Sequence, residues 1–139
     1  MGLWDFFNKT KPVQEYDWLS NTPKELADVL LDEIYSNPQS CDKDQIHEGI
    51  GEFGLEKTNP VPVFGIPEDK VYLSYLRTKN GEILRYTRTG SLQVDNISKL
   101  IDEYEIFDKK GDTLAFICIS HYHRRTSQKA PEGFILKYS

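Results

Sequence analysis

The 139-residue chain lacks several features that would narrow its class. It has two cysteines, Cys41 and Cys118, without C-x-x-C spacing or a disulfide framework, and this favours a reducing compartment. No apolar run approaches the roughly 18–20 residues that a membrane-spanning helix needs. The first nine residues lack the basic start and long apolar core of a secretory signal. The sequence therefore predicts a cytoplasmic protein without a transmembrane segment.

Motifs of catalytic chemistry are equally scarce. Ser120 and Ser127 lie outside any G-x-S-x-G elbow, and His47-Glu48 does not continue into an H-E-x-x-H pattern. Asp42 and Asp44 begin like a calcium loop, but the other ligands and the turn glycine are missing. These absences predict no metal and no cofactor, and they favour a protein that is not an enzyme.

The hydrophobic and aromatic content of the chain predicts one folded domain spanning residues 1–139. A hydrophobic content of 38% with 12% aromatic residues is enough to offset the chain entropy of a domain this size. Residues 1–70 carry 14 acidic and 6 basic side chains, whereas residues 71–139 carry 8 acidic and 11 basic ones. The acidic half argues against nucleic-acid binding, and the basic half leaves room for an anion site or an acidic partner.

An N-terminal arm, residues 1–21, carries four large apolar side chains, Leu3, Trp4, Phe6 and Phe7. A short helix of this kind suits a membrane surface or a partner, but such anchors are usually longer and more basic. We therefore expect the arm to dock on the core of this protein.

Residues 22–55 form the predicted helical part. A helix is expected over residues 23–36, with a capping box from Thr22 and Glu25 and a stop at Asn37-Pro38. Its apolar residues recur at helical spacing and are expected to face the core: Leu26, Val29, Leu30 and Ile34, widened by Ala27, Leu31 and Tyr35. A second, weaker helix is expected from Asp42, with three glycines shortening it.

Residues 56–70 contain three prolines and a glycine and are expected to form an extended connection into an antiparallel sheet, which is predicted over residues 71–139. Asn80-Gly81 favours a hairpin turn, which would pair Lys79 with Glu82 and Tyr75 with Tyr86. The face with alternating apolar residues is expected to be buried: Val71, Leu73, Tyr75, Leu84 and Tyr86. Further strands are expected at 101–108, 113–122 and from Phe134. The prediction is an α+β fold in which N-terminal helices pack on an antiparallel meander of four to five strands.

The most informative segment is 114–129, where an apolar run opens into cationic and polar residues. On a continuing strand, His121 and His123 share a face and are candidates for proton transfer or ligand contact. A phosphate or carboxylate would suit the basic and hydroxyl groups that follow them, and two arginines flank the predicted hairpin face. The resulting candidates for anion or partner binding are His121, His123, Arg124, Arg125, Ser127, Lys129, Arg77 and Arg88.

Two simpler interpretations stay open at this stage. The basic cluster would also be satisfied by pairing with the acidic N-terminal half. In segment 102–105, Glu103 and Glu105 share one strand face and Asp102 lies on the other. That pattern is more typical of a solvated strand than of paired catalytic carboxylates.

Several linear blocks resemble a group of small uncharacterised bacterial proteins across residues 59–136. The blocks are 59–63, 72–78 with Gly81-Glu82, 88–91, 122–127 and 130–134. The resemblance implies a bacterial, intact domain, and it transfers no activity and no catalytic residue.

The leading functional hypothesis is a non-enzymatic accessory or protein-binding module that recognises a partner through its sheet and the cationic segment. The alternative is a small enzyme or binder that acts on a phosphorylated or other anionic small molecule through segment 121–129. In that alternative, a histidine would serve as the acid or base, and the arginines would clamp the anion.

Overall fold

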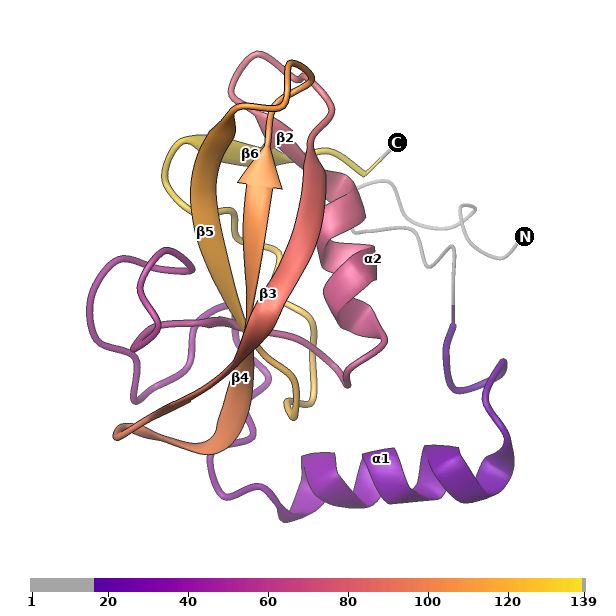
Figure 1. The fold of residues 1–139 in the computed structure, drawn as a ribbon. Helices are drawn as coiled ribbons and strands as arrows, with labels where there is room; N and C mark the ends of the chain where they lie inside the picture. Colours follow the sequence, from indigo (N-terminus) through magenta and orange to yellow (C-terminus); the bar gives the residue numbers. More distant parts are fainter. Residues whose placement is uncertain (1–16, 139) are drawn as a thin grey trace.

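The computed structural model describes residues 17–138 of the chain. It contains two helices, a mixed four-stranded sheet of order β1-β5-β4-β3 and a two-stranded sheet (Figure 1), so the fold is α+β. β1 runs parallel to β5, and the other neighbours are antiparallel. The elements are α1 Lys24–Ser36, β1 Val61–Pro62, α2 Glu68–Tyr75, β2 Leu76–Thr78, β3 Arg85–Val94, β4 Ile97–Phe107, β5 Thr113–Ser120 and β6 Phe134–Leu136. The predicted docking of Leu3, Trp4, Phe6 and Phe7 lies outside the described residues.

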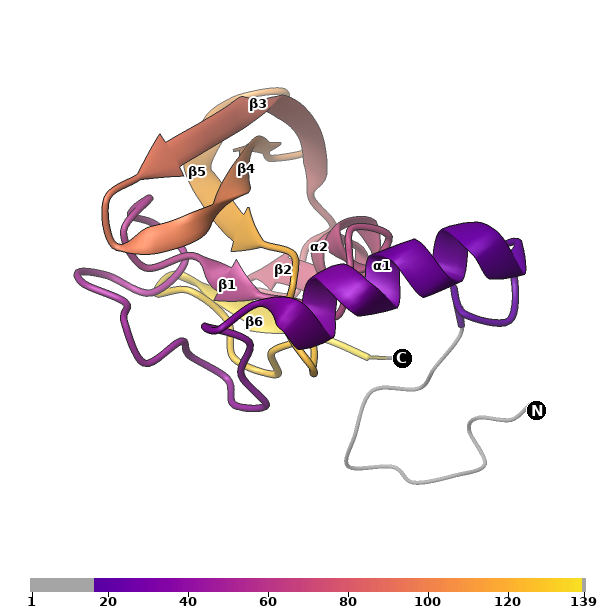
Figure 2. The same cartoon turned by 90° about the horizontal axis from the view of Figure 1, so that it is seen from below.

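Helix α1 confirms the first predicted element, with different details. Its N-cap is Pro23, and no side chain caps it, so the expected capping box does not form. Ala27 and Ile34 are buried against Trp18, but Leu26 and Val29 are exposed, contrary to the predicted apolar face. Figures 1 and 2 show α1 at one end of the molecule, beyond the lower end of α2 and to one side of the four-stranded sheet. The helix therefore leaves part of its apolar surface uncovered by the described chain.

The second predicted helix, from Asp42, is wrong. Residues 37–60 form turns and bends. Gly51 and Gly54 have φ of +99° and +75°, values that a right-handed helix cannot contain. A side chain from the turn between β3 and β4 holds this segment in place: the Asn96 amide donates to the backbone oxygens of Glu48 and Thr58 at 2.9 and 2.8 Å.

The predicted strand from Val71 is also wrong, because residues 68–75 form helix α2. Pro67 and two acidic residues suit a helix start, and Tyr72, Leu73 and Tyr75 fit a buried helix face as well as a strand face. The Asn80-Gly81 turn is present, with Gly81 at φ +85°. It pairs Arg77 with Ile83, one residue away from the predicted register.

The remaining strands agree better with the prediction. Strand β5 matches the predicted strand 113–122 closely, and β4 starts four residues before the predicted 101–108. The predicted closing strand forms as β6, but it pairs with β2 in the second sheet and not with the meander. The sheet is therefore mixed, and its first strand, β1, comes from the segment expected to be a connection.

The main core lies between α2 and one face of the four-stranded sheet. Tyr72 and Leu73 of α2 pack in one buried cluster with Tyr104, Ile106 and Ile117 of the sheet. On the other sheet face, Cys118 packs with Ile46 from the 37–60 segment. The inner face of β3 and β4 continues past the main core toward α1, and there the side chains become polar.

Candidate functional site

A pocket of about 900 Å³ opens where α1, the start of α2 and the β3-β4 hairpin meet. Its apolar lining is provided by Leu26, Leu30, Ile66, Pro67, Val71, Leu100 and Tyr122. Its polar lining is provided by Asp69, Lys70, Arg88, Ser91, Asp102, Tyr104 and His121. Mainly apolar walls with a few grouped polar side chains, at this volume, are typical of small-molecule sites.

The polar residues form one connected network on the pocket floor. His121 Nδ1 lies 2.9 Å from Asp69 Oδ1, and His121 Nε2 lies 3.5 Å from Asp102 Oδ2. The Tyr104 hydroxyl donates to the other oxygen of Asp69 at 2.9 Å. The imidazole ring is therefore held between carboxylates from two different elements, α2 and β4.

Arg88 and Ser91 complete the network around Asp102. Arg88 donates through Nε and Nη2 to the two carboxylate oxygens, at 2.9 and 3.2 Å. The Ser91 hydroxyl donates to Asp102 Oδ1 at 2.8 Å. This two-point guanidinium contact fixes the orientation of the carboxylate.

A register shift in β3 makes this arrangement possible. Arg88 pairs with Tyr104, but Gly90 pairs with Glu103 and Ser91 with Asp102, so the ladder skips a residue between Arg88 and Gly90. Residues three apart point to opposite faces of a regular strand. The bulge brings Arg88 and Ser91 onto the same face, where both contact Asp102.

The network is close to electrically neutral when its imidazole is protonated. Burial disfavours the charged ring, but Asp102 and Asp69 outweigh burial and raise the pKa of His121 to about 9. Burial also opposes ionisation of Asp102, yet hydrogen bonds from His121, Arg88 and Ser91 hold its pKa well below the usual range. Burial raises the pKa of Asp69, against hydrogen bonds from His121 and Tyr104 that favour its charged form. At neutral pH His121 is therefore a cation with both ring nitrogens directed at carboxylates.

The charges differ sharply in their access to the pocket. Asp69 is 1% exposed and Asp102 is 6% exposed, so both acids lie beneath the surface. The Arg88 side chain is 52% exposed, and its Nη1 atom has no hydrogen-bond partner within residues 17–138. Lys70 is exposed and has no ion-pair partner in the described part of the chain. A molecule entering the pocket therefore meets the two cations first.

His123 occupies a different environment, although it lies two residues after His121. Strand β5 ends at Ser120, so the alternation that would give the two histidines a common face does not continue. His123 Nδ1 accepts the backbone N–H of Cys41 at 3.1 Å, and Nε2 lies 2.8 Å from the Ser120 hydroxyl. Burial lowers the pKa of His123 to about 4. His123 is a neutral side chain that connects β5 to the 37–60 segment.

The basic segment after His123 contacts the 37–60 segment in the same way. Arg125 forms an ion pair with Asp44 at 2.6 Å, and Arg124 donates to the Ser40 backbone oxygen at 3.1 Å. Lys129 Nζ donates to Gln45 Oε1, and the Ser127 hydroxyl donates to the Asp44 backbone oxygen. The contact of Arg125 with Asp44 is the acid pairing of the simpler interpretation, and the other three contacts are to backbone or amide oxygens of the same segment.

Of the eight predicted site residues, His121 and Arg88 lie in the pocket. Arg77 lies elsewhere, because its Nη1 donates to the backbone oxygens of Ser74 and Leu76 at the end of α2. Sequence reasoning missed Asp69, which it placed in a connecting segment, and Lys70 beside it. It placed Asp102 on the other strand face from Glu103 but did not say which face is buried, and it assigned Asp102 no role. A helix start at Pro67 was the signal available for Asp69.

Three of these groups also have metal-ligand chemistry. Donor atoms of Asp69, Asp102 and His121 lie within 4.8 Å of one another. Arg88, however, donates to both oxygens of Asp102, and a guanidinium this close opposes a cation. The donor set is therefore better explained as an internally neutralised network.

Comparison of the chain with models of known families, with curated proteins and with solved structures found no match. In the described part of the chain, neither helix has the length and apolar character needed to cross a bilayer.

Proposed function

We propose that the protein binds an amphipathic organic anion in the pocket between α1, α2 and the β3-β4 hairpin. The apolar part of the ligand would lie against Leu26, Ile66 and Leu100, which are 51%, 44% and 54% exposed. Its carboxylate or phosphate would lie against Arg88 Nη1 and Lys70. The observation that carries the proposal is the combination of apolar walls with accessible cations and buried acids.

The geometry supports binding better than catalysis. A general acid or base must reach the proton that it transfers. His121 directs both ring nitrogens to Asp69 and Asp102, and the Ser91 hydroxyl is already donated to Asp102. The network thus serves to hold Arg88 in place at the edge of the pocket. Protein-partner recognition through the sheet and cationic segment stays a prediction, and the contacts of Arg124, Arg125 and Lys129 do not add to its support.

A homologous series of ligands tests the proposal directly. Octanoate, decanoate and dodecanoate should bind with rising affinity in isothermal titration calorimetry at low ionic strength. Burial of each CH₂ contributes about 0.8 kcal/mol, so two of them should strengthen binding about 15-fold. Octylammonium should bind far more weakly than octanoate, because the accessible charges are cationic, and 1-octanol should fall between the two.

Lys70→Gln provides the matched test of the head-group contact. It should weaken decanoate binding about two- to fivefold, the usual range for an exposed ion pair. Lys79→Gln removes the same charge in the Asn80-Gly81 turn, at the end of the molecule away from α1, and should leave affinity unchanged. Affinity that does not depend on chain length, or equal effects of the two variants, would contradict the proposal.

A further inference from the structure

The polar lining of the pocket has a small net charge. The carboxylates of Asp69 and Asp102 are balanced by His121 and Arg88, at contact distances of 2.9–3.5 Å. Lys70 is exposed, and among the charged residues of this lining it alone has no ion-pair partner in the described part of the chain. The lining as a whole therefore carries a single positive charge.

Few hydrogen-bond donors are left here for a ligand. Arg88 donates from Nε to Asp102 and from Nη2 to both Asp102 and Ser91. Within residues 17–138, the N–H groups of Nη1 are the part of the guanidinium that stays free. A head group thus meets one nitrogen of Arg88 and the ammonium group of Lys70, and not the two-nitrogen edge with which arginine usually holds a phosphate.

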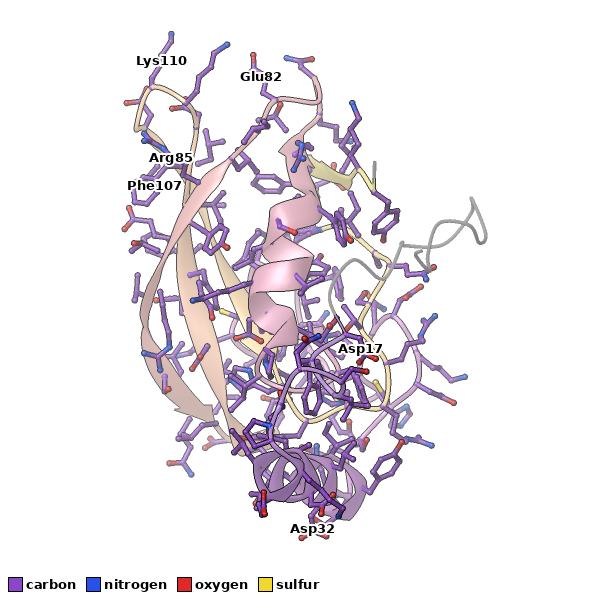
Figure 3. All side chains as sticks on the ribbon, turned by 90° about the vertical axis from the view of Figure 1, so that its right-hand side faces the viewer. Asp17, Asp32, Glu82, Arg85, Phe107 and Lys110 are labelled. Carbon is purple, nitrogen blue, oxygen red and sulfur yellow. The ribbon has the colours of Figure 1, made fainter. Side chains whose placement is uncertain are left out.

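The surroundings of the pocket are acidic. Helix α1, which provides one wall, contains four acidic residues and one basic residue: Glu25, Asp28, Asp32, Glu33 and Lys24. Figure 3 shows Asp32 on α1 and Asp17 between α1 and the lower end of α2. Burial raises the pKa of Glu68, the first residue of α2, and the negative charge of Asp17 adds to this rise. These carboxylates make the electrostatic potential around the pocket more negative and oppose a highly charged anion.

The charge of a head group determines two opposing contributions to its binding free energy. Attraction to the pocket rises in proportion to the charge, whereas the cost of removing water from an ion rises with the square of the charge. Lys70 is exposed and its ammonium group is strongly hydrated, so solvent weakens its attraction for the ligand. A second negative charge therefore costs more in lost hydration than it gains from the pocket.

We propose that the pocket selects amphipathic anions whose head group carries a single negative charge and discriminates against dianionic phosphate monoesters. This selectivity rests on the proposed function and narrows the ligand class to carboxylates and phosphodiesters. Fatty acids and lipids with a phosphodiester head group share the required chemistry.

Decyl sulfate and decyl phosphate test the selectivity, because they share the tail and a tetrahedral head group and differ in charge. At pH 7.5 the sulfate carries one negative charge and the phosphate about two, since the second pKa of a phosphate monoester is about 6. In isothermal titration calorimetry of the full-length chain at low ionic strength, below the micelle concentrations, decyl sulfate should bind about tenfold more tightly. Equal affinities, or tighter binding of decyl phosphate, would overturn the proposal.

Leu100→Lys supplies a second unpaired cation, because Leu100 lines the pocket and is 54% exposed. It should favour decyl phosphate and reduce the ratio of the two affinities from about tenfold to about twofold. Ile83→Lys adds the same charge at a 68% exposed residue in the Asn80-Gly81 hairpin, away from α1, and should leave the ratio unchanged. Circular dichroism confirms that both variants fold. Equal effects of the two variants on the ratio would contradict selection by charge at the pocket.

Decanoate and methyl decyl phosphate distinguish the two sources of a single charge. Each should bind more tightly than decyl phosphate, and the tighter of the two assigns the pocket to fatty acids or to phosphodiesters. Weaker binding of both than of decyl phosphate would overturn the proposal.

The selectivity and the proposed function fail in different ways. If neither decanoate nor decyl sulfate binds, the proposed function is wrong and the selectivity is wrong with it. If decyl phosphate binds as tightly as decyl sulfate while Lys70→Gln still weakens both, the selectivity is wrong and the proposed function stands.

Discussion

His121 and His123 lie two residues apart and occupy opposite electrostatic environments. His121 is held between Asp69 and Asp102, and its pKa rises to about 9. His123 lies between a backbone N–H and a serine hydroxyl, and its pKa falls to about 4. Both are buried, so burial alone does not determine the charge of a histidine. The difference arises from whether carboxylates are close enough to outweigh the cost of burying a cation.

Replacing each histidine by leucine should have the largest effect on the free energy of unfolding and so tests this difference most strongly. His121→Leu removes the cation between two buried carboxylates, and the free energy of unfolding should fall by about 3–5 kcal/mol, measured by urea denaturation. Adding Asp69→Asn should recover part of the loss, because it removes an uncompensated buried charge. A double variant less stable than His121→Leu alone would show that the pairing is not the source of the effect.

His123→Leu should have a smaller effect. It leaves the Cys41 N–H and the Ser120 hydroxyl without their imidazole partner, and an unsatisfied buried polar group costs about 1–3 kcal/mol. The measurement is the same urea titration. The expected loss does not involve charge, so it should be the same at pH 7.5 and pH 8.5. A loss larger than that of His121→Leu would reverse the assignment of the charged and neutral sites.

The pH dependence of the free energy of unfolding also distinguishes the two histidines, and it should be the smallest of the expected effects. The folded-state pKa of His121 is about 9, above an unfolded value of about 6.5. Its stabilising contribution is therefore complete below about pH 6.5 and is lost as the pH rises toward 9. Between pH 7.5 and 8.5 the free energy of unfolding should fall by about 1 kcal/mol.

His121→Leu should remove most of this slope. Glu68 is the control, because burial raises its pKa from 4.5 to about 7, so its stabilising contribution has the same sign but is lost mainly between these two pH values. Glu68→Gln should therefore change the profile near pH 7 and leave the slope above pH 7.5. The neutral His123 acts in the opposite direction, since its contribution is present above pH 6.5 and is lost as the pH falls toward 4. A flat profile between pH 7.5 and 8.5 would contradict a protonated His121.

The sequence correctly predicts the elements whose residue pattern fits only one type of secondary structure. It fails where the pattern fits both a helix and a strand. Helix α1 and strand β5 have long apolar patterns with clear limits. Residues 68–75 satisfy both helical and strand spacing, and the strand interpretation, favoured by the Asn80-Gly81 turn, is wrong. That one error hid Asp69: its position in α2 directs the side chain toward Tyr104 and His121, whereas a residue in a connecting segment has no direction that the sequence defines.

The candidate site was partly predictable for a similar reason. Arg88 and His121 stand out by residue type, but their partner Asp102 resembles an ordinary strand residue among acidic neighbours. No spacing rule links Arg88, Asp102 and His121, because they come from β3, from β4 and from the residue after the end of β5. The pairing of Arg125 with Asp44, by contrast, follows from the charge imbalance between the two halves of the chain.

The bulge in β3 also makes the contacts to Asp102 independent of one residue of strand length. Strand β3 is at the edge of the four-stranded sheet and pairs with β4 alone. Removing one residue at Thr89-Gly90 would place Ser91 two residues after Arg88, so a regular strand would still direct both side chains toward Asp102, and no second ladder would be disturbed. Loss of one residue at this position can therefore leave the contacts to Asp102 intact, while the buried residues of α2, β4 and β5 stay as they are.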